Sequence, residues 1–259
     1  MGEYSLRIPK EVVVEPTIVN PSPRWPPARL RDPLPFGYIH IAAAVQPPAQ
    51  PGPPFPRPSA RRKALLGRLK GLAADLMRLD EVERASIYRA ALVPPTGGGE
   101  PASHPARFDV AALIETSSPS EIAKVQAAEP YQQLLEAVQE VAQDVHLMAA
   151  RCARLLGDVD KSRPGLFLFN HFTTEEPQVA LELWERLAGW YAVETGLDNS
   201  TLLQPIGEAD YVFVNHARWD HSLPRLMLEQ FARPSFRSYV LANLRANRTV
   251  SMPVLYRLA

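Results

Sequence analysis

The feature that most constrains the fold of this 259-residue chain is a repeated order of predicted elements. Short apolar segments rich in β-branched residues indicate strands, and apolar residues spaced three and four apart indicate helices. Two consecutive stretches each run strand, helix, strand, strand, helix, strand, which predicts an internal duplication. The predicted strands cover 37–45, 83–93, 107–118, 145–155, 165–172, 201–207, 210–219 and 248–258.

Four predicted amphipathic helices complete the pattern. We expect Ser59 to cap the first helix and Gly196 to end the third. Pro130 should bend or interrupt the second helix, because proline lacks the amide donor that a helix interior needs. Pro234 occupies the matching place in the fourth helix. The predicted helices cover 60–79, 118–143, 177–197 and 223–247.

Each stretch has the element order of the ferredoxin-like βαββαβ plait, in which a four-stranded antiparallel sheet carries both helices on one face. The other face is apolar, and two such sheets in one chain cover it most simply by packing against each other. We therefore expect an α+β fold in which two ferredoxin-like halves form an intramolecular α+β barrel. The expected divisions are a Pro-rich arm over 1–35, a first half over 36–156 and a second half over 163–259.

The uneven distribution of proline sets the arm apart from the rest of the chain. Fifteen of the 27 prolines lie in the first 60 residues. Proline has no N–H donor and biases the residue before it toward extended conformations, so such a stretch forms neither a continuous helix nor a central strand. We expect residues 1–35 to be an extended arm that wraps on the body or contacts a protein partner.

Composition excludes several classes of partner. The 28 Lys and Arg residues are balanced by 28 Asp and Glu residues, so the chain lacks the positive charge with which proteins neutralise nucleic-acid phosphates. No apolar run reaches the roughly 18 residues that a membrane-spanning helix requires. The single Cys152 forms neither an intramolecular disulfide nor a multi-cysteine metal site. We expect a cytoplasmic protein that binds neither nucleic acid nor membranes.

Two segments of the second stretch resemble a known group of proteins. The strand FVNHARW at 213–219 and the helix ARPSFRSYV at 232–240 look like elements of the antibiotic-biosynthesis monooxygenases, in the dimeric α+β barrel superfamily. The resemblance covers 165–259 best and 37–155 more loosely. Such relatives include cofactor-independent oxygenases of polycyclic phenols, haem-degrading enzymes and small proteins without an assigned reaction. In the oxygenases, a pocket between sheet and helices holds an aromatic substrate near Asn, Trp, Arg or His side chains.

The matching strand positions make Asn170, His171, Asn215 and His216 the candidate catalytic residues. Their strands are neighbours in the plait, so two Asn-His pairs should lie side by side. Because side chains alternate between the faces of a strand, one polar group of each pair must enter an apolar layer. There, asparagine could stabilise the oxyanion of a phenolic substrate while histidine acts as the base. The alternative is a set of cross-strand hydrogen bonds that only fixes the register.

Four further residues of the second half are candidate substrate contacts. Trp184 and Tyr191 are seven residues apart and share a helix face, where they could form an aromatic wall or pack in the core. Arg218 could neutralise a substrate anion or form a salt bridge at the rim. Trp219 shares its strand face with Asn215. A pocket in the C-terminal half would draw on all four.

We expect no cofactor and no metal. The haem-degrading relatives carry a Trp and a His on the second helix, and this chain is similar to them only at Asn170, so haem is a disfavoured alternative. His40 and His146 should be adjacent in the first half. Two imidazoles without a carboxylate nearby make a weak metal site.

The first half looks degenerate, because Ala112, Leu113 and Thr116 stand where the second half carries an Asn, a His and a Trp. The leading hypothesis is a monooxygenase-like or ligand-binding protein that takes a hydrophobic or aromatic small molecule in its C-terminal half. The alternative is a non-enzymatic structural or protein-interaction barrel.

Overall fold

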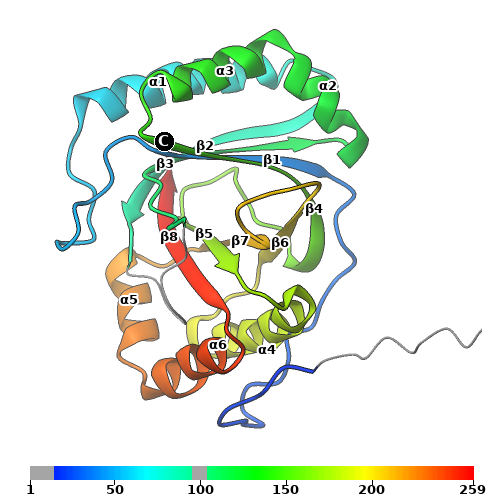
Figure 1. Cartoon of the computed structure of the whole chain (residues 1–259), viewed down its shortest axis with the longest axis vertical. Helices are drawn as coiled ribbons and strands as arrows, with labels where there is room; N and C mark the ends of the chain where they lie inside the picture. Colours follow the sequence, from blue (N-terminus) through cyan, green and yellow to red (C-terminus); the bar gives the residue numbers. More distant parts are fainter. Residues whose placement is uncertain (1–14, 95–103) are drawn as a thin grey trace, which may run out of the picture.

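The computed structural model describes residues 15–94 and 104–259, so the first 14 residues of the expected arm lie outside it. Within the described residues, eight strands form a closed antiparallel barrel in the order β1-β3-β2-β8-β5-β7-β6-β4 (Figure 1). The strands are β1 (Gly37–Ala44), β2 (Val82–Leu92), β3 (Val110–Thr116), β4 (Asp144–Gly157), β5 (Leu166–Thr173), β6 (Ser200–Pro205), β7 (Phe213–Trp219) and β8 (Val250–Leu258).

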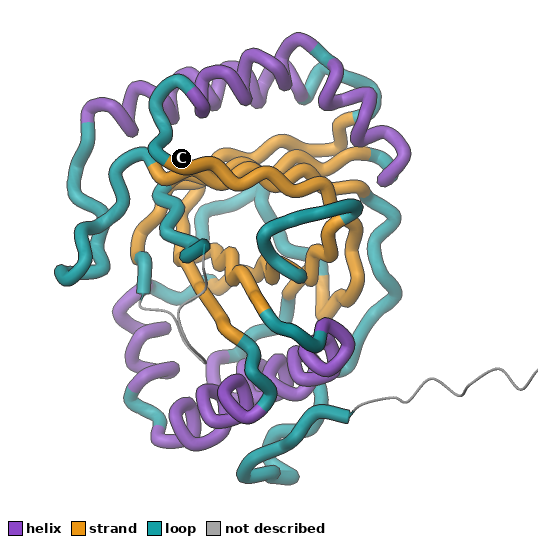
Figure 2. The backbone as a smooth tube through the Cα atoms, in the orientation of Figure 1, coloured by secondary structure: helices purple, strands orange, loops and turns teal. Residues whose placement is uncertain are grey.

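Helices cover two opposite sides of this barrel (Figures 1 and 2). The helices of the first stretch are α1 (Ala60–Leu76), the short 3₁₀ turn η1 (Pro119–Glu121), α2 (Ile122–Ala127) and α3 (Glu129–Gln139). Those of the second stretch are α4 (Pro177–Thr195), α5 (Leu223–Phe231), the π-helical segment η2 (Phe236–Leu241) and α6 (Ala242–Ala246).

Strand pairing follows the same scheme in both stretches. The fourth strand pairs with the first, the first with the third and the third with the second, which gives β4-β1-β3-β2 and β8-β5-β7-β6. The pairs β2–β8 and β4–β6 then join the two groups of strands. Closure satisfies the backbone groups that an open sheet would leave at its edges.

Local signals in the sequence account for several helix ends. The side chain of Ser59 accepts a hydrogen bond from the backbone of Arg62, as expected of an N-cap. Gly196 ends α4 with a positive φ of 66°, a conformation that glycine adopts without a steric cost. Pro130 lies in the first turn of α3, and the helix expected over 118–143 is interrupted before it. The predicted interruption is therefore confirmed.

Three apolar layers hold the fold together. The barrel interior is filled by aromatic and aliphatic side chains, including those of Tyr88, Phe108 and Phe169. Between the barrel and α1–α3, the buried cluster consists almost entirely of aliphatic residues such as Ile41 and Leu69. Between the barrel and α4–α6, the layer contains Trp184, Trp190 and Trp219 together with Phe172, Phe213 and Phe236. The two helix layers therefore differ in kind, although their strands and helices are arranged alike.

Residues 17–28 run along the outside of α4, η2 and α6, and Arg31 then pairs with Leu155 of β4 before the chain enters β1 (Figure 1). The indole of Trp25 packs on the ring of Tyr239, with centroids 4.8 Å apart, and its Nε1 donates to Glu194 at 2.8 Å. The amide of Ala28 donates to the carbonyl of Glu185 on α4. These contacts tie α4 to the segment that precedes β8.

None of the helices in the described ranges is long and apolar enough to span a membrane.

Candidate functional site

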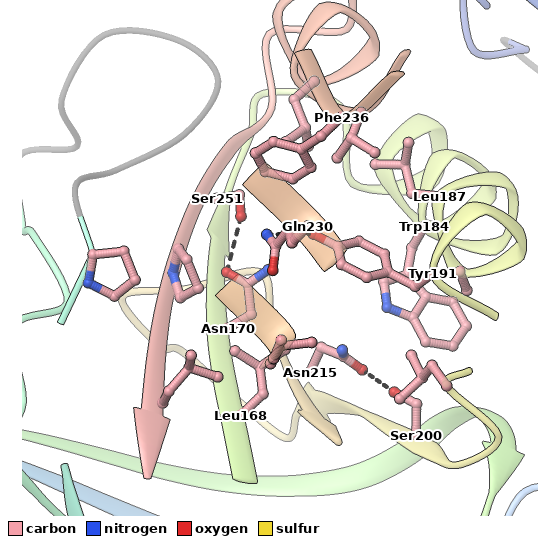
Figure 3. Close-up of a pocket in the computed structure, with 18 of the residues that line it drawn as sticks. Leu168, Asn170, Trp184, Leu187, Tyr191, Ser200, Asn215, Gln230, Phe236 and Ser251 are labelled. Atoms are coloured by element: carbon pink, nitrogen blue, oxygen red, sulfur yellow. Dashed lines mark hydrogen bonds between the residues drawn. The ribbon is translucent and has the colours of Figure 1, made fainter. Parts of the chain in front are cut away.

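A cavity of about 250 Å³ lies between strands β5–β8 and the helices of residues 177–246, with Pro94 also among its lining residues. Strands β5, β6, β7 and β8 form its floor, and α4, α5, η2 and α6 form its walls (Figure 3). Most of the side chains that line it are apolar, and among the described lining residues none is charged and none is a histidine. Its polar groups come from Asn170, Tyr191, Ser200, Asn215, Gln230, Trp219 and Ser251.

Asn170 and Asn215 are direct partners in the register of β5 and β7. Both side chains therefore face the cavity from neighbouring strands, as Figure 3 shows. Each amide oxygen accepts a hydrogen bond from a serine hydroxyl. Ser251 donates to Oδ1 of Asn170 at 2.9 Å, and Ser200 donates to Oδ1 of Asn215 at 2.5 Å.

The two amide nitrogens are left without a protein partner. Among the described residues, no hydrogen bond from Nδ2 of Asn170 or of Asn215 is present, although Asn215 is only 7% exposed. Neither nitrogen is among the fully buried, unpartnered side-chain atoms of the described residues, so both are accessible from the cavity and can donate to a ligand oxygen. The floor of the cavity therefore presents two neighbouring donors in an apolar surrounding.

Aromatic side chains form one wall of the cavity. Trp184 and Tyr191 of α4 both line it, in agreement with their seven-residue spacing. Trp219 lines it from β7 and donates its indole N–H to Thr195 at 3.0 Å. Gln230 of α5 reaches across the cavity and donates to the hydroxyl of Tyr191 at 3.2 Å.

His171 and His216 lie on the opposite face of the same strands, inside the barrel. Both are buried, and neither lines the cavity. The His216 ring stacks on Phe169 at a centroid distance of 4.3 Å, and its Nδ1 lies 3.0 Å from the carbonyl oxygen of Leu168. The structure thus brings the two asparagines together in the cavity and separates both histidines from them.

The barrel interior gathers further histidines around His171. The rings of His40 and His146 lie 5.4 and 6.1 Å from it, measured between centroids. Burial lowers the pKa of His171 to about 3 and lowers the pKa of His40 well below its usual value. Both rings are therefore neutral near pH 7, and they lie in the packed core of the barrel.

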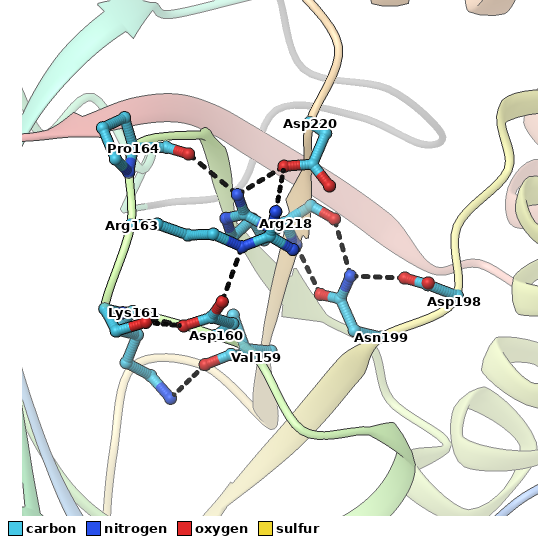
Figure 4. A network of polar contacts seen from close by, with 10 residues as sticks. Val159, Asp160, Lys161, Arg163, Pro164, Asp198, Asn199, Arg218 and Asp220 are labelled. Atoms are coloured by element: carbon cyan, nitrogen blue, oxygen red, sulfur yellow. Dashed lines mark hydrogen bonds and ion pairs between the residues drawn. The ribbon is translucent and has the colours of Figure 1, made fainter.

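Arg218 also points away from the cavity. Its guanidinium donates to the carbonyl of Pro164 at 2.8 Å and to Asp220 at 2.5 Å (Figure 4). Its side chain is 3% exposed and lies 5.8 Å from the centre of the Phe167 ring. Arg218 therefore forms a salt bridge with Asp220, which was the alternative to a role in neutralising a substrate anion.

The donors around the cavity do not fit a metal or a haem iron. In the described part of the chain, no group of three or more His, Cys, Asp or Glu side chains is arranged to hold a metal ion. Axial haem ligands are typically histidine, cysteine, methionine or tyrosine, and among the described residues that line the cavity only Tyr191 is of these types. Its hydroxyl accepts a hydrogen bond from Gln230, and burial raises its pKa, which opposes the phenolate that iron would bind.

Sequence reasoning missed three of the polar residues at this site. Ser200 and Ser251 support the asparagines from the flanking strands β6 and β8, and Gln230 faces them from α5. Strand alternation would have put Ser251 on one face with Pro253 and Leu255, both of which line the cavity. The signal for Gln230 is weaker, because a glutamine on an amphipathic helix usually faces solvent.

The sequence matches no protein-family model, and no curated protein matches it at a significant level. Solved structures do resemble the fold. An anthrone oxidase-like protein aligns with a TM-score of 0.60 and 14% identity over 90% of this chain and 94% of its own. A proposed monooxygenase from Fusobacterium nucleatum subsp. nucleatum aligns with a TM-score of 0.51 and 6% identity over 88% and 94%. At these identities the similarity shows a shared α+β barrel fold.

Proposed function

We propose that the cavity of the second half binds a flat, hydrophobic aromatic molecule that carries acceptor oxygens, and that the protein is a cofactor-independent monooxygenase. The observation that carries this proposal is the pair of unpartnered amide nitrogens of Asn170 and Asn215 on the floor of an otherwise apolar cavity. The tryptophans and Tyr191 offer ring faces against which a planar ligand can stack. The structures of similar fold described as a monooxygenase and as anthrone oxidase-like support the same class of reaction.

The chemistry follows from what the cavity contains. The described residues that line the cavity include no histidine, aspartate, glutamate or lysine to act as a general base. The substrate must therefore itself be acidic, as a CH₂ group activated by neighbouring phenol rings is. The two amides would stabilise the oxyanion that forms when this group loses a proton to water, and both CH₂ hydrogens end in the water molecule that is released. Transfer of one oxygen atom from O₂ then converts CH₂ to C=O, and the second oxygen atom leaves as water. This balance needs no external reductant.

Only the second half would act in this reaction. We propose that each half, 36–156 and 163–259, is a ferredoxin-like unit of a tandem duplication, and that the first has lost its pocket. The aliphatic cluster under α1–α3 supports this view, because Ala112, which stands where the second half carries Asn215, is buried there among apolar side chains. We also propose a cytoplasmic location, without nucleic-acid or membrane partners, from the balanced charge and the single buried Cys152.

The test uses 1,8-dihydroxyanthrone as substrate and 1,8-dihydroxyanthraquinone as a product-like ligand. We expect O₂ uptake with formation of the quinone above the rate without protein, and saturable binding of the quinone. Asn170→Ala and Asn215→Ala should each weaken binding by about tenfold or more, the loss expected when a buried polar contact is removed. They should change the free energy of unfolding by only ~1 kcal/mol, because each asparagine makes a single hydrogen bond here.

Gln204→Ala is the matched control, because this amide lies on β6 but pairs with Arg151 outside the cavity. It should leave turnover and binding unchanged. If the wild-type protein neither binds the quinone nor accelerates oxidation, the proposal is wrong and the non-enzymatic interaction barrel is favoured. Asparagine variants that lose several kcal/mol of stability would instead indicate a register-fixing role.

A further inference from the structure

The floor of the cavity carries four polar residues in a row across four adjacent strands. In the strand order β8-β5-β7-β6, they are Ser251, Asn170, Asn215 and Ser200. Asn170 and Asn215 are direct partners, while each serine is displaced by two residues from the partner of its asparagine. Diagonal neighbours of this kind share a face of the sheet and lie close enough to interact.

We propose that Ser200 and Ser251 are positioning residues that fix the polarity of the two amides and thereby make the cavity select ligands with acceptor rather than donor groups. The inference rests on the proposed function, since it concerns the same cavity. An asparagine amide can turn by 180° and exchange its oxygen for its nitrogen. A hydroxyl that donates to Oδ1 opposes this turn, and it leaves Nδ2 directed away from the serine.

Both serine hydroxyls donate to an amide Oδ1, and the distance at Asn215 favours that orientation. The contact between Ser200 and Asn215 measures 2.5 Å, which is at the short end of the O–H···O range and below the N–H···O range, and it is shorter than the 3.3 Å from the same hydroxyl to the carbonyl oxygen of His216. Ser251 donates to Asn170 and has no second acceptor in the described residues. Because the hydroxyls come from opposite sides of the asparagine pair, both amides present N–H groups to the ligand.

Two ligands of nearly the same shape can measure whether the amides present donors or acceptors to the cavity. In 1,8-dihydroxyanthraquinone, the phenolic protons bond internally to the carbonyl, so the outer lone pairs act as acceptors. In 1,8-diaminoanthraquinone, each amino group keeps one outward N–H and acts as a donor. The ring system is the same in both, and stacking on Trp184 and Tyr191 should contribute equally. The ratio of the two dissociation constants therefore measures the polarity of the floor.

We expect the wild-type protein to prefer the dihydroxy ligand by about tenfold or more, and Ser200→Ala and Ser251→Ala each to reduce that ratio by about fivefold, as expected for one hydrogen bond. Ser→Cys at either position, with its weak donor, should give an intermediate ratio if the alanine variant folds poorly. Thr201→Val is the matched control, because this neighbour on β6 is buried but does not line the cavity. It should leave the ratio unchanged.

A measurement without ligand separates this inference from the proposed function. NMR relaxation of the side-chain ¹⁵NH₂ groups should show both amides rigid in the wild-type protein. Ser200→Ala should loosen Asn215 alone, and Ser251→Ala should loosen Asn170 alone. If neither alanine variant changes the relaxation of its partner amide, the inference is wrong, whether or not the quinone binds. If the amides loosen as expected and the wild-type protein binds neither ligand, the positioning role holds and the proposed function fails. A ligand ratio that survives both substitutions would also overturn the inference.

Discussion

Asn247 pairs with both backbone polar groups of Thr17. Its Oδ1 accepts from the Thr17 amide and its Nδ2 donates to the Thr17 carbonyl, each at 2.8 Å. Asn243, one helical turn earlier, binds the amide and carbonyl of Val19 in the same way, at 2.7 and 2.9 Å. The two asparagines thus hold an extended segment through its backbone, as a neighbouring strand would.

The double substitution Asn243→Ala and Asn247→Ala should release the segment around 17–19. It removes six hydrogen bonds, four to Thr17 and Val19 and two to the carbonyls of Tyr239 and Asn243, so we expect a loss of ~3–6 kcal/mol in the free energy of unfolding and faster proteolysis before residue 30. Urea unfolding and limited proteolysis measure the two effects. Asn20→Gly is the control, because it removes one exposed bond to Ser238 and tolerates the positive φ of 53° at that residue. An intact arm in the double variant would contradict the prediction.

Gly189→Ala should destabilise the protein, although alanine is the better helix former. A Cβ at this position of α4 would overlap the carbonyl oxygen of Pro26, so the arm must move. Gly67→Ala on α1 meets nothing within 4 Å and should stabilise by ~0.5–1 kcal/mol. Thermal unfolding of the two variants checks the opposite signs. Stabilisation by both substitutions would show that the arm does not pack closely on α4.

Acid should unfold the protein because of the histidines inside the barrel. Burial lowers the pKa of His171 to about 3, and the pKa values of His40 and His216 are also lowered by burial. An unfolded histidine has a pKa near 6.5, so the unfolded state binds these protons first as the pH falls. Stability is therefore complete above about pH 7. Below about pH 6.5 it should fall by roughly 1.4 kcal/mol per pH unit for each histidine that stays neutral.

Urea unfolding at several pH values between 8 and 5 measures this dependence. His171→Gln should give a shallower fall, by the contribution of one proton, whatever its effect on stability at pH 8. Gln204→Ala, which removes no titratable group, should keep the slope of the wild-type protein. A stability that does not change between pH 7 and 5 would rule out neutral buried imidazoles.

Lys161 and Glu115 form a buried ion pair at 2.9 Å, with side chains 4% and 6% exposed. Removing Lys161 leaves Glu115 with only the more distant and more exposed Arg84, at 3.7 Å, so Lys161→Met should cost about 3–5 kcal/mol. The double variant Lys161→Met and Glu115→Gln should recover most of this loss, because no buried charge then lacks its partner. Equilibrium unfolding of the single and double variants tests the coupling. Equal losses in both would show that the two side chains act independently.

The strands, helices and their interruptions were predictable because they depend on local patterns. Pro130, Ser59 and Gly196 act on their own segments and behave as expected. The alternation of side chains along a strand also correctly predicted that Asn170 and His171 lie on different faces of β5. It could not show which face holds a cavity, because the walls come from residues far away in sequence, such as Gln230 and Phe236.

Residues that act by supporting others were harder to find. A serine in a strand carries no pattern of its own, and the role of Ser251 appears only when β8 lies beside β5. The contact between His40 and His171 inside the barrel was equally hard to predict. These residues are 131 positions apart and become neighbours only when the barrel closes. Long-range pairing, rather than local propensity, decides which polar groups become neighbours.

The two faces of strand β5 carry chemically different side chains, and only the alternation of residues along the strand decides which side chain lies on which face. Asn170 faces the cavity and His171 faces the barrel interior. Since side chains alternate, one residue inserted before Asn170 would exchange their faces, placing the imidazole on the cavity side of the sheet and the amide inside the barrel. An amide floor that donates hydrogen bonds would become a floor with a titratable base. A single β-bulge is thus a short evolutionary or engineering path from one reaction chemistry to another on an unchanged barrel.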